Sequence, residues 1–281
     1  MLESALYIVP TPIGNMQDIT LRAIEVLKNA TLIAAEDTRH SKLLLDHIGV
    51  KGTRMISCHD HNEEQRVEII KNEIEKGGAV ALISDAGTPL ISDPGYRVVS
   101  LCAKQNVKVV PLPGPCAAIT ALEMAGLPTD SFLFAGFLPV KDKELREKIS
   151  TLTANSVTTV FYEAPRRVKN TAKVMAEIIP EHDICVCREL TKAFESAYRM
   201  KVKELPAFLE EDENRTRGEF VLVVGPVPTK ESEEVDEKVV VALKKLIETS
   251  PVKVVCSSLS DITGINRNRL YDIALKLKSN S

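Results

Sequence analysis

The regular alternation of short apolar runs with helix-patterned segments is the feature that most limits the possible folds. Four runs in the first part of the chain have the length and composition of buried strands: "LYIV", "LIAA", "AVALI" and "VKVV". Between the first two, Leu21, Ile24 and Leu27 recur at one-turn spacing after a capping residue, Asp18 or Thr20. This alternation predicts an α/β domain with a mainly parallel sheet.

A second set of apolar runs follows residue 115: "FLFAGFL", "VTTVFY", "ICVCREL" and "EFVLVVG". With helices expected at 142–154 and 166–178, these runs predict a second α/β domain. The stretch "PVPTKESEEVDEK" has the composition of a linker, and a helix, a turn at Gly264 and another helix follow it, as in a helix-turn-helix unit. The predicted divisions are two α/β domains at 1–112 and 113–228, a linker at 229–238 and a helical tail at 239–281.

Composition excludes several classes of protein. No apolar run reaches the roughly 18 residues of a membrane span, and Glu3 stands where a secretory signal carries positive charge, so we expect a cytoplasmic protein without a membrane partner. The six cysteines form no paired CxxC motif, which favours reduced, packed thiols over disulfides or zinc. Because the formal net charge is −3, any contact with nucleic acid needs a local basic patch, and the segment 141–203 is net positive.

Two loops in the first domain carry residues that could bind a ligand. In "VPTPIGN" the prolines donate no hydrogen bond and Gly14 lets a ligand approach the backbone, so the loop is either a stiff turn or a carbonyl-rich site for a ligand with donor groups, such as an adenine. In "SDAGTPLISDPG", Asp85 follows a strand directly, where α/β proteins place ligand contacts. Asp93 is expected to cap the next helix, with Pro94 at its first position.

Four further clusters of candidate residues lie at predicted strand ends or helix starts. Cys116 and Ala117 begin a helix, either to admit a flat ligand or to allow close helix packing. The stretch "CRELTKAFESAYRMKVK", if helical, places Arg188 and Lys192 on one face; surface ion pairing is the alternative. The remaining polar residues are Glu36, Asp37, Arg39 and His40 after the second strand, and Glu163, Arg166 and Arg167 in "VFYEAPRRV", where paired arginines suit phosphate.

These loops, in this order, resemble those of the tetrapyrrole-methylase-like S-adenosylmethionine transferases, and within them the bacterial 16S rRNA ribose 2′-O-methyltransferase I family. The resemblance runs from "LYIVPTPIGN" through "SDAGTPLISDPG", "PLPGPCAAITAL", "FYEAPRRV" and "CRELTKAFE" to "RGEFVLVVGP". It implies two α/β domains of tetrapyrrole-methylase type with the cofactor cleft between them, a small C-terminal helical domain and a homodimer. It also implies S-adenosyl-L-methionine as cofactor, 16S rRNA or the small ribosomal subunit as partner, and methylation of a cytidine ribose in the decoding region.

The resemblance also implies which residues form the site. Cofactor contacts are expected from Pro12, Ser84, Asp85, Thr88, Cys116, Ala117, Glu163 and Leu190. The candidate catalytic residues, as proton acceptors or as groups that hold RNA or polarise the hydroxyl, are Glu36, Asp37, Arg39, Glu189 and Lys192. RNA binding is expected at Arg166, Arg167, Arg188, Arg199 and Lys201, with Lys192 and the tail residues Arg267 and Arg269 as further contacts. The sequence contains no metal-ligand cluster, which favours a metal-free displacement.

Two other functions stay open at this point. The first is a same-fold methyltransferase acting on a small molecule such as a corrin precursor. The tetrapyrrole enzymes have a glycine-rich first loop and a Gly-Asp-Pro second loop, whereas this chain has "PTPIG" and "SDAGTP", which argues against a porphyrinoid substrate. The second is a nucleic-acid-binding regulator that acts through the tail. There Asp261 and Asp272 lie beside Arg267 and Arg269, a mixture of charges that suits groove binding poorly.

Overall fold

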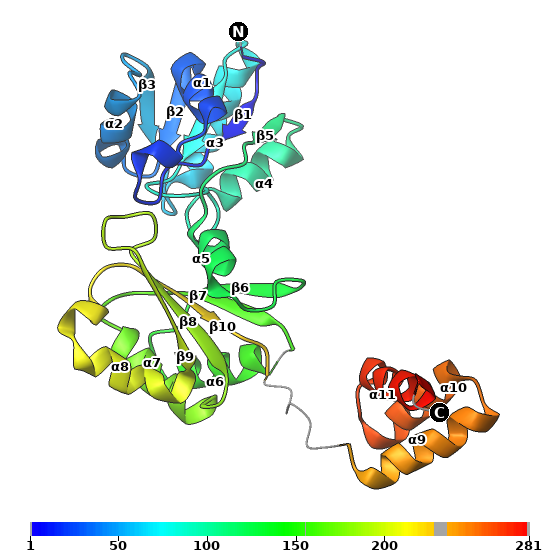
Figure 1. Ribbon diagram of the computed structural model, residues 1–281. Helices are drawn as coiled ribbons and strands as arrows, with labels where there is room; N and C mark the ends of the chain where they lie inside the picture. Colours follow the sequence, from blue (N-terminus) through cyan, green and yellow to red (C-terminus); the bar gives the residue numbers. More distant parts are fainter. Residues whose placement is uncertain (1, 155, 228–234, 280–281) are drawn as a thin grey trace. The chain divides into compact units, whose positions relative to one another are not determined.

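The computed structural model describes residues 2–154, 156–227 and 235–279. These residues form two five-stranded sheets with helices packed on them, and a group of three further helices (Figure 1). The chain separates into two compact units, Met1–Val227 with both sheets and Pro228–Ser281 with the three helices. The predicted boundary at residue 112 lies inside the first unit, just after the last strand of the first sheet, and it stays a prediction. The predicted linker 229–238 lies largely outside the described residues.

The first sheet is entirely parallel. Its strands run in the order β3-β2-β4-β1-β5: β1 (Leu6–Ile8), β2 (Leu32–Ala35), β3 (Arg54–Ser57), β4 (Val80–Ile83) and β5 (Val109–Pro111). Every residue of β1, β2 and β4 is buried, because helices cover both faces of a parallel sheet. Alternate residues therefore enter two different cores: Tyr7 and Ile33 lie in one, and Leu6 and Leu32 lie in the other.

Helices surround this sheet. One of these helices, and one strand of the sheet itself, were not predicted from the sequence. The helices are α1 (Leu21–Asn29), α2 (Thr38–His47), α3 (Glu63–Glu75) and α4 (Tyr96–Lys104), with a 3-10 turn η1 (Met16–Asp18). Thr20 caps α1 by accepting a hydrogen bond from the Ala23 N–H at 3.1 Å, which settles the choice between Asp18 and Thr20. The missed elements are α2, whose segment is largely polar, and the edge strand β3, which is only four residues long and not fully buried.

The prediction that Asp93 caps a helix is wrong. Helix α4 begins at Tyr96, and Gly95, with a φ of 123°, occupies the N-cap position. The buried Glu63 carboxylate takes over the capping role from α3, because it accepts hydrogen bonds from the backbone N–H groups of Arg97 at 2.8 Å and Val98 at 3.2 Å. A contact between two distant segments thus takes the place of a local side-chain cap, so Asp93 is not needed to cap the helix.

The predicted parallel character is found in the first sheet, for which it was predicted, whereas the second sheet is mostly antiparallel. Its strands run in the order β6-β7-β10-β8-β9: β6 (Phe132–Phe137), β7 (Thr158–Glu163), β8 (Asp183–Arg188), β9 (Ser196–Lys201) and β10 (Phe220–Val224). Only β6 and β7 pair in parallel. The stretch after Arg188 is not a helix, since all six residues of β9 pair with β8, and the loop between them holds Glu189 and Lys192.

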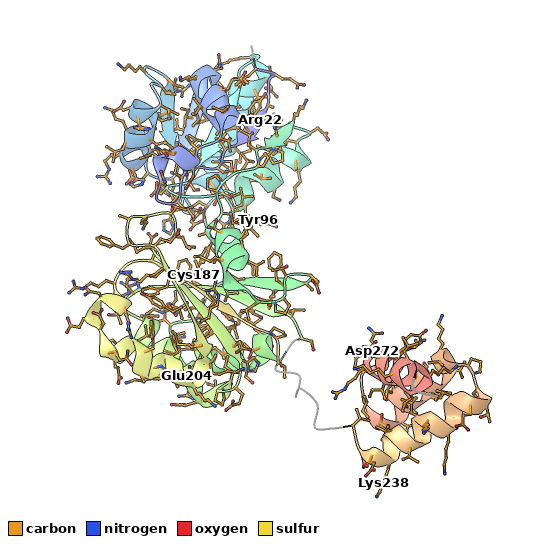
Figure 2. The ribbon with its side chains drawn as sticks, viewed as in Figure 1. Arg22, Tyr96, Cys187, Glu204, Lys238 and Asp272 are labelled. Atoms are coloured by element: carbon orange, nitrogen blue, oxygen red, sulfur yellow. The ribbon has the colours of Figure 1, made fainter. Side chains whose placement is uncertain are left out.

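Helices cover the two faces of the second sheet. Helix α5 (Ala117–Ala125) packs on one face, where the buried Cys187 Sγ lies 3.8 Å from the carbonyl oxygen of Ala121 (Figure 2). The other face carries α6 (Asp142–Thr153), α7 (Val168–Ile178) and α8 (Leu205–Glu211), with the short 3-10 turns η2 (Val202–Glu204) and η3 (Glu213–Thr216). The starts of α6 and α7 agree with the predicted helices to within two residues. All six cysteines are free, and all but Cys116 are buried.

The tail folds around its own small core. It consists of α9 (Glu237–Thr249), α10 (Val252–Thr263) and α11 (Arg267–Ser279), and their apolar side chains meet in a core that includes Leu243, Ile247, Leu270 and Ala274. Gly264 ends α10 with a φ of 71°, which confirms the predicted turn. Nowhere in the described residues is there a helix long and apolar enough to cross a membrane.

Candidate functional site

Two neighbouring cavities open at the carboxyl ends of the first sheet's strands, facing the second sheet. The larger has a volume of about 340 Å³ and is lined mainly by apolar groups, among them Ile13, Ala117, Phe137, Tyr162, Leu190 and Val221. The smaller has a volume of about 280 Å³, and the charged residues that line it are Asp85, Lys192 and Glu219. The two share Ile13, Ala86 and Glu219, so they are separated by little more than these residues.

The predicted cofactor contacts divide between the two cavities. Thr88, Cys116, Ala117, Glu163 and Leu190 line the larger one, whereas Pro12, Ser84 and Asp85 line the smaller one. The loops after β1 and β4 that carry these residues are joined by a backbone pair, since the N–H of each of Thr11 and Gly87 donates to the carbonyl of the other at 2.9 and 3.0 Å. Gly87 has a φ of 79°, a conformation that a side chain would strain, so glycine keeps this junction closed.

Asp85 is tied to the residues after β2. Its Oδ1 accepts a hydrogen bond from the Asp37 N–H at 3.1 Å, and its own N–H donates to Glu36 Oε2 at 3.3 Å. Burial raises the pKa of Glu36, although the hydrogen bond from Asp85 opposes this shift. Hydrogen bonds from Arg39 lower the pKa of Asp37 to about 2, and Asp37 caps α2. Asp37 and Arg39 form an ion pair with each other. None of the candidate catalytic residues Glu36, Asp37 and Arg39 lines either cavity.

Asp93 is a site residue that the sequence analysis did not place in the site. It lines the larger cavity, where burial raises its pKa to about 6. A hydrogen bond with Ser84 opposes the shift, and the nearby Glu36 and Asp85 carboxylates add to it. The only local signal was the "SDPG" sequence, which has the same form as a helix cap.

The raised pKa of Asp93 predicts a pH-dependent stability. Between about pH 4 and pH 6 the folded chain holds a proton that the unfolded chain has lost, so the free energy of unfolding falls as the pH rises through this range. The rise of the Asp93 pKa from 3.8 to about 6 is roughly a hundredfold difference in proton affinity between the two states, which corresponds to about 3 kcal/mol at most, and solvent near the carboxyl reduces this. Urea unfolding at pH 4.5 and 7.5 should show that Asp93→Asn removes about 1–2 kcal/mol of this fall. Equal pH dependence in variant and wild type would contradict the assignment.

The start of α5 forms one wall of the larger cavity. Thr88 Oγ1 donates to the Pro115 carbonyl at 2.8 Å, which joins the β4 loop to this helix start. Cys116 occupies the N-cap position without a side-chain cap, as the sequence suggested, and the Ala118 N–H donates to the Tyr162 hydroxyl oxygen at 3.1 Å. Burial raises the pKa of Tyr162, so its hydroxyl keeps its proton at neutral pH. The small Ala117 leaves room for a ligand beside these groups.

Glu163 is buried at the end of β7 and is held by several groups. Its Oε1 accepts from the Ala164 N–H at 2.7 Å, and its Oε2 accepts from the Thr171 hydroxyl at 2.6 Å. The Arg167 guanidinium lies 3.1 Å away and also donates to the carbonyls of Leu138 and Pro139. Arg167 was predicted to bind RNA, but its guanidinium N–H groups donate to Glu163 and to backbone carbonyls of the protein. The neighbouring Arg166 is exposed.

The loop between β8 and β9 reaches from the second sheet to the first-sheet loops (Figure 1). The Asn15 N–H donates to Thr191 Oγ1 at 3.1 Å, and a Cβ at Gly14 would lie 2.5 Å from Lys192 Cγ, so glycine is needed there. Glu189 and Thr191 adopt left-handed backbone conformations, with φ of 52° and 64°. The buried Leu190 between them lines the larger cavity.

Lys192 is held by two carboxylates. Its Nζ lies 3.1 Å from Glu189 Oε1 and 2.9 Å from Glu219 Oε2. Burial opposes the charged forms of Lys192 and Glu189, but the hydrogen bonds outweigh it, so the pKa of Lys192 is raised and that of Glu189 is lowered. Both groups stay charged at neutral pH, which makes Lys192 a hydrogen-bond donor and not a proton acceptor.

The other predicted RNA contacts are also bound to the chain itself. Arg188 donates to the carbonyls of Arg217 at 2.9 Å and Phe194 at 3.1 Å. Arg199 donates to the carbonyls of Ala125 and Met124, and Lys201 lies 2.7 Å from Asp183. The structure therefore does not bring these cations together as one free patch, and their role toward RNA stays a prediction.

Comparison with known proteins identifies relatives of both units. Residues 5–206 match the tetrapyrrole (corrin/porphyrin) methylases, and residues 233–278 match the RsmI C-terminal HTH domain. "Ribosomal RNA small subunit methyltransferase I" of Escherichia coli O157:H7 is 45% identical over 98% of this chain and 96% of that protein. The protein of the same name from Pseudomonas aeruginosa is 40% identical over the full length of both.

Solved structures share the fold of the first unit. The cobalt precorrin-4 methyltransferase structure has a TM-score of 0.59 at 20% identity and covers 79% of this chain and 95% of its own. Uroporphyrin-III C-methyltransferase from Thermus thermophilus, solved with S-adenosyl homocysteine, has a TM-score of 0.53 at 17% identity and covers 79% of this chain and 98% of its own. At these identities the likeness shows a common fold.

Proposed function

Because this chain belongs to the tetrapyrrole (corrin/porphyrin) methylases, and within them to the ribosomal RNA small subunit methyltransferases I, we propose that it transfers a methyl group from S-adenosylmethionine to the 2′-hydroxyl of a cytidine ribose in the decoding region of 16S rRNA. The observation that carries this proposal is the 40–45% identity to rRNA methyltransferases over nearly the full length of both chains. The likeness to corrin and porphyrin enzymes is confined to the fold, so the rRNA function is supported over both rival functions.

The larger cavity suits S-adenosylmethionine. Apolar and aromatic walls such as Phe137 and Tyr162 can enclose a purine, and the small Ala117 leaves space beside the helix start. The carboxylates of Asp93 and Glu219 also face this cavity and favour a cation such as a sulfonium. The predicted contacts Thr88, Cys116, Ala117, Glu163 and Leu190 would hold the cofactor there, whereas Pro12, Ser84 and Asp85, also predicted as cofactor contacts, line the smaller cavity and would lie beside the cofactor's reactive end.

The chain's own contribution to catalysis would be mainly positioning. Bound S-adenosylmethionine supplies an activated methyl group, and the protein has to align it with the ribose oxygen, which can contribute about 7–11 kcal/mol to the barrier. A base that accepts the hydroxyl proton would add about 10²–10⁴ in rate. Among the candidates, Asp37 is a poor base because its pKa is about 2, and Lys192 stays protonated. Lys192 instead orients the Glu189 and Glu219 carboxylates at the edge of the site.

RNA binding would involve the exposed Arg166 together with the tail, where Arg267 and Arg269 belong to the first turn of α11. We expect the protein to act on 16S rRNA or the small ribosomal subunit as a cytoplasmic homodimer. Arg188, Arg199 and Lys201 would add positive charge to the first unit without giving up their contacts within the chain.

This assignment predicts a strong salt dependence of RNA binding. A protein that neutralises about four phosphates loses affinity with a slope of about −3 in a plot of log affinity against log salt concentration. Filter binding with small subunits between 50 and 300 mM KCl, roughly the range over which such slopes are resolved, should show this slope, and Arg166→Ala should make it shallower by about one. Calorimetry over the same range should give an unchanged cofactor affinity. A flat RNA response would show that the contact is not electrostatic.

Labelled methyl transfer tests the proposed function directly. Purified protein with S-adenosylmethionine carrying a labelled methyl group is incubated separately with small ribosomal subunits, naked 16S rRNA and uroporphyrinogen III. We expect label in RNA and none in the tetrapyrrole. Label in the tetrapyrrole alone would overturn the proposal.

A further inference from the structure

We infer that the smaller cavity binds the acceptor nucleoside of the RNA and that the Ser41 hydroxyl, on α2, hydrogen-bonds to it. This inference rests on the proposed function and assigns a binding site to it. The cavity is lined by the loop after β1, by α2, by the start of the β4 loop and by Lys192 and Glu219.

The position of the smaller cavity suits the second substrate of a transfer reaction. It shares Ile13, Ala86 and Glu219 with the larger cavity, so ligands in the two cavities would meet across these residues. Methyl transfer requires the donor carbon and the acceptor oxygen to approach to roughly 3–3.5 Å. Two adjoining cavities provide this arrangement without a rearrangement of either sheet.

Ser41 gives an independent sign of a missing ligand. Its side chain is only 3% exposed, yet its Oγ has no hydrogen-bond partner within the described part of the chain, and Ser41 lines the smaller cavity. A buried hydroxyl without a partner is unfavourable, and such groups are rare in folded proteins. A bound ligand that hydrogen-bonds to the Ser41 hydroxyl would supply the missing partner and so favour the complex over the free protein.

The lining of the cavity fits a nucleoside better than a phosphate. The Asp85 and Glu219 carboxylates would repel a phosphate, and the Lys192 charge is already balanced by Glu189 and Glu219. Carboxylates accept hydrogen bonds from exocyclic amino groups such as that of cytosine, and a serine hydroxyl can bond to a ribose hydroxyl or a base edge. Met16 and Leu43, both partly exposed, supply apolar surface for the face of a base.

The volume also limits the ligand. At about 280 Å³ the cavity lies near the lower end of the roughly 300–1,000 Å³ of small-molecule sites. It therefore fits one nucleoside unit of a longer chain, with the rest of the RNA outside, and it is small for a macrocycle.

The test compares two serines whose buried hydroxyls both lack a hydrogen-bond partner in the described part of the chain. The Oγ of Ser196, on β9, is also buried without a partner in the described residues, but Ser196 lines neither cavity. Ser41→Ala and Ser196→Ala are assayed for KM and kcat with small ribosomal subunits, for cofactor affinity by calorimetry and for thermal stability. We expect Ser41→Ala to raise KM by on the order of tenfold, the effect of one hydrogen bond. Cofactor affinity should stay unchanged, neither variant should melt at a lower temperature than the wild type, and Ser196→Ala should match the wild type in KM and kcat.

A second variant covers the case in which Ser41→Ala does not fold. Leu43 lines the same cavity with a side chain that is 66% exposed, so Leu43→Glu should fold normally and should also raise KM. An unchanged KM in both variants of an active enzyme would overturn the inference and leave the proposed function standing. Loss of cofactor affinity in Ser41→Ala would also overturn it, because the cavity would then belong to the cofactor. Absence of RNA methylation by the wild type would instead remove the proposed function, and the inference with it.

Discussion

Replacing Glu163 by alanine is expected to lower the free energy of unfolding by about 3–5 kcal/mol, because it leaves a largely buried arginine without its counter-charge. The Glu163 side chain is fully buried and that of Arg167 is 20% exposed. The substitution also removes the acceptors for the Thr171 hydroxyl and the Ala164 N–H. Urea unfolding followed by circular dichroism measures the change.

A surface ion pair provides the matched control. Glu177 lies 2.6 Å from Arg146, closer than Glu163 lies to Arg167, but both side chains of this surface pair are well exposed. Glu177→Ala should therefore cost less than about 1 kcal/mol. If the two alanine variants unfold at the same urea concentration, the buried pair does not stabilise the fold as we describe.

Replacing Ala117 by phenylalanine should weaken binding of S-adenosylmethionine by about 10- to 100-fold, because the ring would occupy the larger cavity. The effect follows from position: Ala117 is the first residue of α5 and lines the cavity beside Cys116. Calorimetry with S-adenosylhomocysteine, which has no methyl group to transfer, measures the loss of affinity directly.

Ile119 lies two residues further along α5 and is 43% exposed, outside the lining of both cavities. Ile119→Phe therefore adds a ring to the same helix without filling the site, and its cofactor affinity should match the wild type. Wild-type affinity in Ala117→Phe, with the variant folded, would place the cofactor elsewhere in the protein.

The first sheet was the most predictable part of the fold, because its central strands are buried on both faces and are therefore continuous apolar runs. The edge strand β3 and the polar helix α2 lack this signal. The stretch after Arg188 has charges at helical spacing, yet pairing of Asp183–Arg188 with Ser196–Lys201 makes it a strand pair, because sheet contacts outweigh local propensity.

The site was predictable only where it lies in one segment. Asp85, Cys116 and Ala117 follow strands or begin helices, and their placement at the cavities agrees with that local pattern. Asp93 was predicted to cap α4, but the Glu63 carboxylate at the start of α3 accepts the hydrogen bonds from the first turn of α4 instead. A contact between two segments so far apart in the sequence leaves no local pattern. Two further features depend on contacts between distant segments, which no local sequence pattern records. They are the Ser41 hydroxyl, which has no hydrogen-bond partner among the described residues, and the position of Glu219 between the two cavities.

Mapping of the methylated nucleotide tests the central claim most directly. Small ribosomal subunits that lack the modification are treated with the purified protein and S-adenosylmethionine bearing a deuterated methyl group, and the 16S rRNA is then digested and analysed by mass spectrometry. The account predicts the labelled methyl group on the ribose of a single cytidine in the decoding region, and slower labelling by Ala117→Phe at subsaturating cofactor. Label on a base, label spread over many nucleotides, or RNA without label would contradict it.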